Sequence, residues 1–429
     1  MKSVSVGMVG CGVVGNGVWN QLQTHRDLLA ARTGLQIEVA RIAVRNPELK
    51  RDFPQTLFTT DWRQVVHDPT VQIVVELMGG TTTAREVARA AIEAGKPFIT
   101  ANKALLAEYG EELFILADKH KVPIYFEASV AGGIPIIKTL REGLRANRIR
   151  AMHGIINGTC NYILTRMSEE GRSFEEVLAE AKKLGYAEAD ESLDVDGIDA
   201  AHKVAVLASI AYGFWVHVDQ VYVEGIRNIS PLDIEQTRRF GYGVKLLAIT
   251  RLNENETVEV RVHPTLIPLD HVLASVSGVY NAIAVEGDIV GRTLFYGRGA
   301  GANPTASAVL ADLTEAALHL VNDVQLRSGM GYQLCGRLIT IDDISTRYYV
   351  RFSVVDRPGV LGTIASIFGN HHIGISSVFQ PEGHEGDTVP LIFLLDLARE
   401  ADFRAAIQTI QKLDVIAAPA CTIRMEDFK

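Results

Sequence analysis

The stretch VSVGMVGCGVVG, residues 4–15, decides the fold of the first half of the chain. Residues 4–9 are typical of a short buried strand, and the spacing Gly10, Gly12, Gly15 opens a helix directly after it. In such a turn the first glycine permits tight chain reversal, the second lets a pyrophosphate approach the backbone, and the third lets helix and strand pack closely. The helix N-terminus then faces the phosphates. We therefore predict a dinucleotide site, with a purely structural turn as the alternative. Its expected contacts are Gly10, Gly12, Val13, Val14 and Gly15.

Strands and helices alternate after this turn. A helix is expected over Val13–Arg32. Further strands are expected over Ile37–Val44, Ile73–Leu77, Pro97–Ala101 and Pro123–Ala128, and helices over Thr83–Ala94 and Gly110–His120. Strands alternating with helices of this length indicate an α/β fold with a Rossmann-type, doubly wound parallel sheet. We place this domain at residues 1–135 and expect the helix of residues 304–325 to complete it.

Beyond residue 135 the pattern changes to an α+β one. Helices are expected over Phe174–Leu184 and Asp199–Tyr212, and a strand over Thr257–Val262, within a domain of residues 136–303. From Tyr348 the order is strand, helix, strand, strand, helix, strand, which is typical of a ferredoxin-like module, here residues 348–425. A linker without a strong pattern, Gly329–Asp343, separates the two.

Composition excludes several classes of function. Lys and Arg number 42 against 51 Asp and Glu, a net charge of −9, so nucleic acid and anionic membrane are not expected partners. Glycines interrupt the N-terminal apolar run, which argues against a signal peptide, and no long uncharged apolar stretch suggests a membrane span. The four cysteines (11, 160, 335 and 421) form no paired motif, which favours a reduced, cytoplasmic setting.

The end of the second strand, Ala43-Val44-Arg45-Asn46, predicts which cofactor is used. An acidic residue there binds the ribose 2′-hydroxyl of NAD, whereas an arginine suits the 2′-phosphate of NADP. No carboxylate stands at this position, and Lys50 and Arg51 follow closely. We predict a preference for NADP through Arg45, with NAD still possible. The alternative is that Arg45 is a solvated loop residue.

Lys103 follows the strand that ends at Thr100, and ligands of doubly wound folds bind at this carboxyl edge of the sheet. Thr100 and Lys103 are therefore candidate contacts to the cofactor, and Lys103 also to a substrate oxygen. A solvated lysine at a strand end is the alternative.

An acidic segment precedes an apolar helix. Its ionisable residues are Asp190, Glu191, Asp194, Asp196, Asp199 and Lys203. A calcium loop counted from Ser192 fails, because its twelfth position is Lys203 instead of a glutamate. A capped helix with Asp196 as the cap and an Asp199–Lys203 ion pair is an adequate structural explanation. However, Lys203 stands where the chain enters the apolar run of residues 204–208, and a desolvated lysine beside carboxylates is suited to proton donation.

The segment Ala181–Lys203 resembles the signature of homoserine dehydrogenases, with Gly185, Asp194, Gly197, Asp199 and Lys203 in register. The family usually has proline where this chain has Glu191. Four further motifs match: Ala101-Asn-Lys-Ala104, Ala131-Gly-Gly-Ile-Pro135, Asn157-Gly-Thr-Cys-Asn-Tyr162 and Gly299-Ala-Gly-Ala-Asn-Pro-Thr-Ala-Ser-Ala308. The resemblance spans about residues 1–325. Within the family, the chain resembles the monofunctional type.

The resemblance implies reversible interconversion of L-homoserine and L-aspartate 4-semialdehyde, on the path to threonine and methionine. It makes Lys203 the proton donor and Lys103 a second cation near the reacting oxygen. It assigns Glu188, Asp194 and Asp199 to the substrate ammonium and to orienting Lys203, and places Gly301 at the cofactor. It also implies a homo-oligomer, a dimer or a tetramer. A sodium ion would be held by backbone carbonyls of Glu127, Val130, Gly132 and Ile134, for which a glycine-rich hinge is the alternative.

Asp356-Arg-Pro-Gly359 joins a strand to a helix and resembles the ligand loop of ACT domains. Backbone amides at a helix start can receive the carboxylate of an amino acid. Asp356 and Gly359 are therefore the candidate regulatory residues, and the resemblance suggests L-threonine as the effector. A dimerisation module without a ligand is the alternative.

Two other functions are compatible with the sequence. One is a reductase of a different amino-acid aldehyde or imine, and the other is a non-catalytic sensor that binds NADP and an amino acid. Cys160 also suggests a covalent nucleophile, but no general base lies near it in the sequence, and small buried thiols are common.

Overall fold

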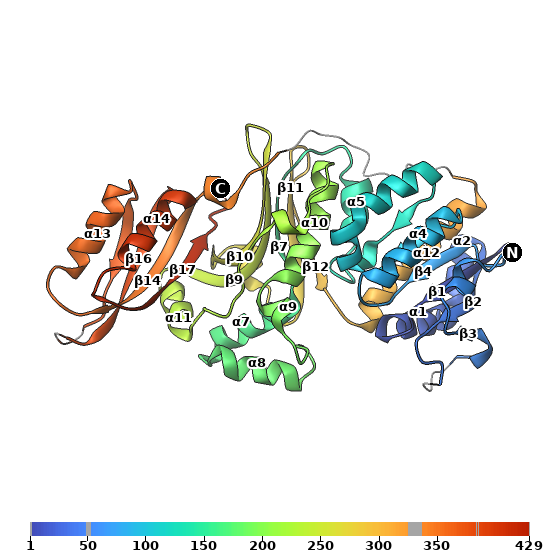
Figure 1. The fold of residues 1–429 in the computed structure, drawn as a ribbon, viewed down its shortest axis with the longest axis horizontal. Coiled ribbons are helices and arrows are strands. Elements are labelled where there is room, and N and C mark those ends of the chain that lie inside the picture. Colours follow the sequence, from blue (N-terminus) through green and yellow to red (C-terminus); the bar gives the residue numbers. More distant parts are fainter. Residues whose placement is uncertain (1, 49–52, 325–336, 383, 385, 429) are drawn as a thin grey trace. The chain divides into compact units, whose positions relative to one another are not determined.

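The computed structural model describes residues 2–48, 53–324, 337–382, 384 and 386–428 (Figure 1). Lys50, Arg51 and residues 329–336 of the expected linker lie outside this part of the chain. The chain forms two compact units. The first comprises Met1–Arg150, His202–Asp219 and Val285–Gly336, and the second Ala151–Ala201, Gln220–Ala284 and Arg337–Lys429.

The first unit contains a six-stranded sheet in the order β3-β2-β1-β4-β5-β6, with parallel pairing throughout. The strands are β1 (Lys2–Val9), β2 (Leu35–Ala43), β3 (Phe58–Thr59), β4 (Ile73–Glu76), β5 (Phe98–Thr100) and β6 (Ile124–Tyr125). Its helices are α1 (Val13–Thr24), α2 (Arg26–Thr33), α3 (Arg63–Val66), α4 (Thr82–Glu93), α5 (Lys103–His120), α6 (Ile136–Lys138) and α12 (Ala302–Val321). This strand order is that of dinucleotide-binding folds, which confirms the predicted doubly wound sheet.

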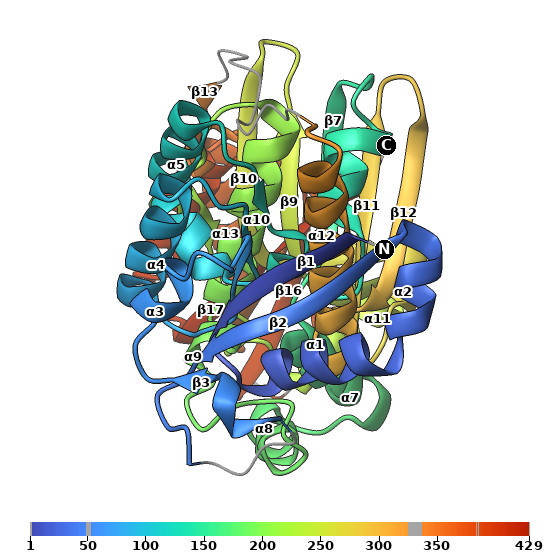
Figure 2. The same cartoon turned by 90° about the vertical axis from the view of Figure 1, so that its right-hand side faces the viewer.

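Helix α12, although distant in sequence, packs on this sheet. Val309 and Leu313 share one buried core with Val4, Val6 and Met8 of β1. Helices α1 and α12 pack against one another, with α1 near the lower end of α12 in Figure 2, and a Cβ at Gly17 would lie 2.9 Å from the carbonyl oxygen of Ala302. The glycine therefore lets the two helices approach closely.

Two helix predictions were wrong in detail. The helix predicted over Val13–Arg32 is interrupted at His25, whose backbone (φ −108°, ψ 17°) ends α1 and begins α2. Helix α5 begins at Lys103 instead of Gly110, because the side chain of Asn102 accepts a hydrogen bond from the amide of Leu105 and caps the helix. Gly110 is an interior helix position, where a Cβ would overlap the indole of Trp215.

The second unit is built on a mixed sheet whose order there is β7-β9-β10-β17-β14-β16-β15. Its first part has β7 (Ile149–Ile155), β8 (Tyr222–Val223), β9 (Tyr242–Leu252) and β10 (Thr257–Pro268), with the helices α7 (Gly158–Glu170), α8 (Phe174–Lys183), α9 (Ser192–Val195) and α11 (Pro231–Arg239). Helix α10 (Ile198–Tyr212) leads the chain back to the first unit, as do β11 (Tyr280–Gly287) and β12 (Gly291–Arg298). The predicted strand Thr257–Val262 is twice as long, running to Pro268 as β10.

The last module has the predicted βαββαβ order. Its elements are β14 (Ser345–Val355), α13 (Val360–Asn370), β15 (Ile375–Phe379), β16 (Thr388–Arg399), α14 (Glu400–Ile410) and β17 (Ile416–Met425), preceded by the short β13 (Arg337–Leu338). The sheet of this module is continuous with the preceding one, because β17 pairs with β10 through Thr265↔Arg424 and Leu266↔Met425. An ion pair reinforces this junction: the half-buried Arg351 of β14 binds the buried Asp233 of α11 at 2.7 Å.

Within the described residues, no helix has both the length and the apolar character needed to cross a membrane.

Candidate active site

The glycine-rich turn has the geometry that a dinucleotide requires. Gly10 has φ +96°, and a Cβ there would lie 2.6 Å from the carbonyl carbon and oxygen of Leu77. A Cβ at Gly15 would lie 2.9 Å from the carbonyl oxygen of Gly10, whereas nothing lies within 4 Å of one at Gly12. The first and third glycines are thus required by the protein itself, and the space beside Gly12 is open to a phosphate group. Val13 and Val14 form the first turn of α1.

Arg45 stands two residues beyond the end of β2 and is exposed, while Ala43 and Val44 before it are buried. The neighbouring Asn46 accepts a hydrogen bond of 3.0 Å from the amide of Glu48, which turns the chain. Arg45 is therefore positioned at the carboxyl edge of the sheet, in the place where the ribose-binding residue stands in dinucleotide folds.

A buried carboxyl group supports the next two strand ends. Glu76, the last residue of β4, accepts hydrogen bonds from the Thr100 hydroxyl and the Met78 amide, both at 2.7 Å. The amide group of Asn102 donates to the Gly80 carbonyl at 2.8 Å, which joins the two loops that follow β4 and β5. Thr100, predicted as a cofactor contact, is buried, and its hydroxyl serves this internal network.

Glu76 was not among the site residues predicted from the sequence. Burial raises the pKa of this carboxyl group to about 7, although the hydrogen bonds from Thr100, Met78 and Asn102 oppose the shift. The available signal was a single carboxylate at the end of the apolar run Ile73-Val74-Val75, where the residue would otherwise be expected to be apolar.

Both predicted catalytic lysines belong to the first unit and are half-buried. Lys103 is the first residue of α5, and Lys203 lies in α10 directly before buried residues 204–208. Trp215, just after α10, packs against Phe114 of α5 with ring centroids 5.9 Å apart. The helix that begins with Lys103 is therefore packed against the segment that follows the Lys203 helix.

The second unit brings two of the three predicted substrate carboxylates together. The side-chain amide of Asn157 donates to Asp194 at 2.7 Å and to Asp199 at 2.9 Å. Asp199 is buried and Asp194 half-buried, whereas Glu188 is exposed in the loop before α9. That loop is held by Thr159, whose hydroxyl donates to the Tyr186 carbonyl at 2.7 Å.

Glu191, where the family usually has proline, forms ion pairs with Lys182 at 2.6 Å and Arg227 at 3.2 Å. Hydrogen bonding to Lys182 holds the pKa of Glu191 at about 2. The alternative explanation of this segment had Asp196 as the cap of the helix, but α10 begins at Ile198, and the Asp196 carboxylate binds Arg227 at 2.5 Å. Ion pairs thus stabilise a loop that proline would stiffen.

Cys160 is fully buried, and its thiol donates to the Asp194 carbonyl at 3.1 Å. This contact fixes α9 against α7 and gives the thiol a structural use.

The segment proposed for sodium, residues 127–134, is a buried, tightly turned loop. Ala131 (φ +55°) and Gly132 (φ +49°) are both left-handed, and a Cβ at Gly132 would lie 2.6 Å from the Gly299 carbonyl oxygen. Glu127 accepts hydrogen bonds from the amides of Ile137 and Lys138, and burial raises its pKa to about 7. Val130 and Ile134 are buried, and the Ile134 carbonyl accepts a hydrogen bond of 2.8 Å from the Ile136 amide. Main-chain carbonyl oxygens are the kind of ligand that suits a hard cation.

In the last module, Gly359 is the N-cap of α13 with φ +92°. Asp356 is fixed by main-chain bonds to Gly386 and Asp387, both 2.8 Å, and its carboxylate accepts from Gln380 at 3.0 Å. These hydrogen bonds hold the loop that leads into the start of α13.

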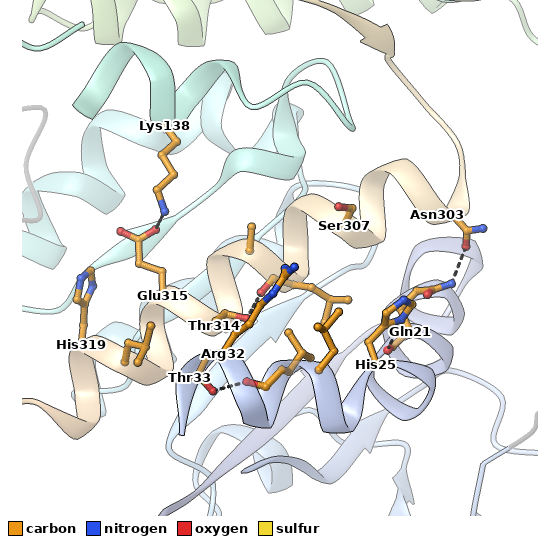
Figure 3. A pocket seen from close by; sticks show the side chains of 15 residues that line it. Gln21, His25, Arg32, Thr33, Lys138, Asn303, Ser307, Thr314, Glu315 and His319 are labelled. Atoms are coloured by element: carbon orange, nitrogen blue, oxygen red, sulfur yellow. Dashed lines mark hydrogen bonds and ion pairs between the residues drawn. The ribbon is translucent and has the colours of Figure 1, made fainter. Parts of the chain in front are cut away.

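A cavity of about 710 Å³ lies elsewhere in the first unit, between α1, α2 and α12 (Figure 3). Its wall includes Gln21, which donates to Asn303 at 3.2 Å, and the Lys138–Glu315 ion pair. None of the residues that line it is among the catalytic, substrate, cofactor, metal or regulatory residues predicted from the sequence.

Comparison with known proteins identifies the family. Residues 10–127 match the NAD-binding domain of homoserine dehydrogenase, residues 135–314 match the homoserine dehydrogenase family proper, and residues 348–415 match the ACT domain. The chain belongs to the homoserine dehydrogenase family. It is 45% identical to the homoserine dehydrogenase of Pseudomonas aeruginosa, over 100% of both chains. It is 44% identical to that of Synechocystis, over 99% of both chains.

Solved structures agree with this assignment. A homoserine dehydrogenase from Thiobacillus denitrificans superimposes with a TM-score of 0.95 at 43% identity, covering 100% of this chain and 99% of that one. A hyperthermophilic archaeal homoserine dehydrogenase in complex with NADPH has a TM-score of 0.62 at 28% identity and covers 74% of this chain and 98% of its own.

The chain is therefore an oxidoreductase with homoserine dehydrogenase activity, and it uses a nicotinamide cofactor. The predicted fold and the predicted ACT module are confirmed. The alternatives of a non-catalytic sensor and of a reductase for another aldehyde or imine are set aside by the same matches.

Proposed function

We propose that this homoserine dehydrogenase prefers NADP and reduces L-aspartate 4-semialdehyde with Lys203 as the proton donor. The observation that carries the proposal is the pair of carboxylates held on Asn157, the second of which, Asp199, lies one helical turn before Lys203 in α10. An acidic pair suits the ammonium group of an amino-acid substrate, and a lysine suits an oxygen that gains negative charge.

The cofactor preference rests on Arg45, which is exposed at the end of β2 where an NAD-specific fold has a carboxylate. The relative that is described with NADPH supports the same choice. NAD stays a usable alternative, because it shares the rest of the nucleotide and only lacks the 2′-phosphate that Arg45 would bind.

The bound cofactor supplies the hydride that reduces the aldehyde carbon. The carbonyl oxygen then develops alkoxide character, and Lys203 donates the proton that neutralises it. Lys103, at the start of α5, provides a second positive charge near the same oxygen. Asp194 and Asp199 bind the ammonium group together with the exposed Glu188, and Asp199 also orients Lys203.

Four further assignments belong to this proposal. The ACT module binds L-threonine at the loop of Asp356 and Gly359 and inhibits the enzyme. The protein is a homo-oligomer, a dimer or a tetramer, in the cytoplasm. A sodium ion is held by main-chain carbonyls of Glu127, Val130, Gly132 and Ile134.

An absorbance assay at 340 nm tests the proposal. Oxidation of L-homoserine should be faster with NADP⁺ than with NAD⁺ at equal concentrations, and aspartate 4-semialdehyde should be reduced in the reverse direction. Faster turnover with NAD⁺ would contradict the cofactor assignment. Equal rates with and without millimolar L-threonine would remove the regulatory assignment and leave the catalytic one intact.

A further inference from the structure

The side chain of Asn157 caps a helix and also contacts both substrate carboxylates. It follows β7 and caps α7, and its side-chain oxygen accepts a hydrogen bond of 2.8 Å from the Cys160 amide. Its amide nitrogen donates one hydrogen bond to Asp194 and one to Asp199. Only 4% of the residue is exposed. The capping bond fixes which end of the side-chain amide faces the two carboxylates, because the opposite orientation would present oxygen to oxygen.

The two carboxylates come from different helices and repel one another. Asp194 lies in α9 and Asp199 in the first turn of α10. Two nearby carboxylates disfavour ionisation of both, and a donor that serves each of them reduces this repulsion. An amide has two hydrogens and no charge, so it can serve both carboxylates without cancelling the negative charge that attracts an ammonium group.

We propose that Asn157 is the positioning residue of the substrate site, setting the separation and the shared ionisation of Asp194 and Asp199. Asn157 acts through these two carboxylates and is not itself a catalytic residue. The inference rests on the proposed function, which assigns the carboxylates to the substrate ammonium.

Substitution by Asp and by Ser tests this role, because both residues can cap a helix. Asn157→Asp should raise KM for homoserine roughly 10–100-fold while KM for NADP⁺ changes less than about twofold, because a third carboxylate replaces the donor. The acid limb of the kcat/KM pH profile should move upward by about one pH unit or more, since three coupled carboxylates hold protons more tightly. Asn157→Ser should raise KM without this pH shift.

Two controls separate positioning from helix capping. Ser173 caps α8 in the same unit through a capping box, so Ser173→Ala should lower Tm by a few degrees and leave KM and the pH profile unchanged. The exchange Asn157→Asp/Asp194→Asn restores two carboxylates and one amide, and should recover most of the pH profile.

The inference is overturned if Asn157→Asp lowers Tm alone, with KM for homoserine and the pH profile unchanged. Asp194→Asn and Asp199→Asn distinguish this result from failure of the proposed function. If these two variants raise KM and Asn157→Asp does not, only the positioning role fails. If Asp194→Asn and Asp199→Asn also leave KM for homoserine unchanged, the substrate assignment of the carboxylates fails as well.

Discussion

Thr100 donates its hydroxyl hydrogen to the buried carboxyl group of Glu76 at 2.7 Å, which joins the carboxyl ends of two adjacent parallel strands. Glu76 is 0% exposed, and burial raises its pKa to about 7 from the ordinary 4.5. A buried polar network at this position keeps the loops after β4 and β5 in register, and Lys103 follows directly on the second of them.

The raised pKa of Glu76 predicts a pH-dependent contribution to stability. Between about pH 4.5 and pH 7, Glu76 is protonated in the folded protein and ionised in the unfolded chain. The stabilisation of the folded state by this group is therefore fully present below pH 4.5 and is lost as pH rises through 7. Relative to Glu76→Gln, the wild type should therefore gain up to about 3 kcal/mol of unfolding free energy as pH falls from 7 to 4.5. Urea unfolding at several pH values measures this, with the exposed Glu108→Gln as control. A constant difference between wild type and Glu76→Gln would refute the shift.

Lys203→Ala should lower kcat by roughly 10²–10⁴, the usual contribution of a positioned general acid, with little change in cofactor affinity. Steady-state kinetics in both directions, together with cofactor titration by fluorescence, would measure the two effects. Lys119→Ala removes an exposed lysine at the far end of α5 and should leave kcat unchanged. The proton-donor role is untenable if Lys203→Ala keeps more than half of the wild-type kcat.

Arg45→Asp should reverse the cofactor preference, because a carboxylate repels the 2′-phosphate of NADP and accepts a hydrogen bond from the 2′-hydroxyl of NAD. The ratio of kcat/KM for the two cofactors is the measurement, and Arg32→Asp, at an exposed position of α2, is the control with the same charge change. An unchanged ratio in Arg45→Asp would show that Arg45 is a solvated loop residue.

The parts of the fold that follow local rules could be predicted from the sequence. The strand, the glycine-rich turn and the start of the helix depend on hydrophobic patterning and glycine spacing, and the structure has them within two residues of the predicted limits, whereas α1 ends at Thr24 instead of Arg32. The start of α5 was missed because a single capping residue, Asn102, decides it. The pairing of β17 with β10 depends on contacts more than 150 residues apart, as in Thr265↔Arg424, and no local pattern carries that information.

The candidate site likewise has residues that the sequence could indicate and interactions that it could not. Asp194 and Asp199 could be selected by residue type and by resemblance, but their shared donor Asn157 lies 37 and 42 residues away. Glu76 looked like the end of an apolar strand, and only burial beside Thr100 shows its altered chemistry. Residue type identifies candidates, whereas the tertiary fold decides which of them interact.

The junction between the ACT module and the catalytic sheet predicts a large stability effect. Asp233 is 0% exposed and is bound by Arg351 at 2.7 Å and by the Tyr349 hydroxyl at 3.0 Å. Arg351→Met leaves a buried carboxylate without its cation, and should cost about 3–5 kcal/mol of unfolding free energy. The double variant Arg351→Met/Asp233→Asn should recover part of this loss. Additive losses in the double-mutant cycle would show that the two residues do not interact energetically.

The start of α13 gives the sharpest test of threonine regulation. The main-chain amides that follow Gly359 are available to a carboxylate at a helix N-terminus, and coupling requires that the effector bind two states of the enzyme with different affinity. A Cβ at Gly359 meets no atom within 4 Å, so a valine there would not clash with the protein, but its φ of +92° is strained for any residue except glycine. Gly359→Val should therefore shift the loop and place a branched side chain at the helix start, where an effector carboxylate would bind.

The expected result is loss of threonine inhibition with uninhibited kcat within about twofold of wild type, since coupling between sites is separate from the chemical step. Gly369→Val is the matched control: it places the same side chain at the other end of α13, with open space around the Cβ and no positive φ. Threonine titrations of the three proteins measure the half-inhibitory concentration. Equal inhibition in all three would place the threonine site outside this loop, and inhibition lost in both variants would indicate that α13 as a whole, instead of its first turn, transmits the signal.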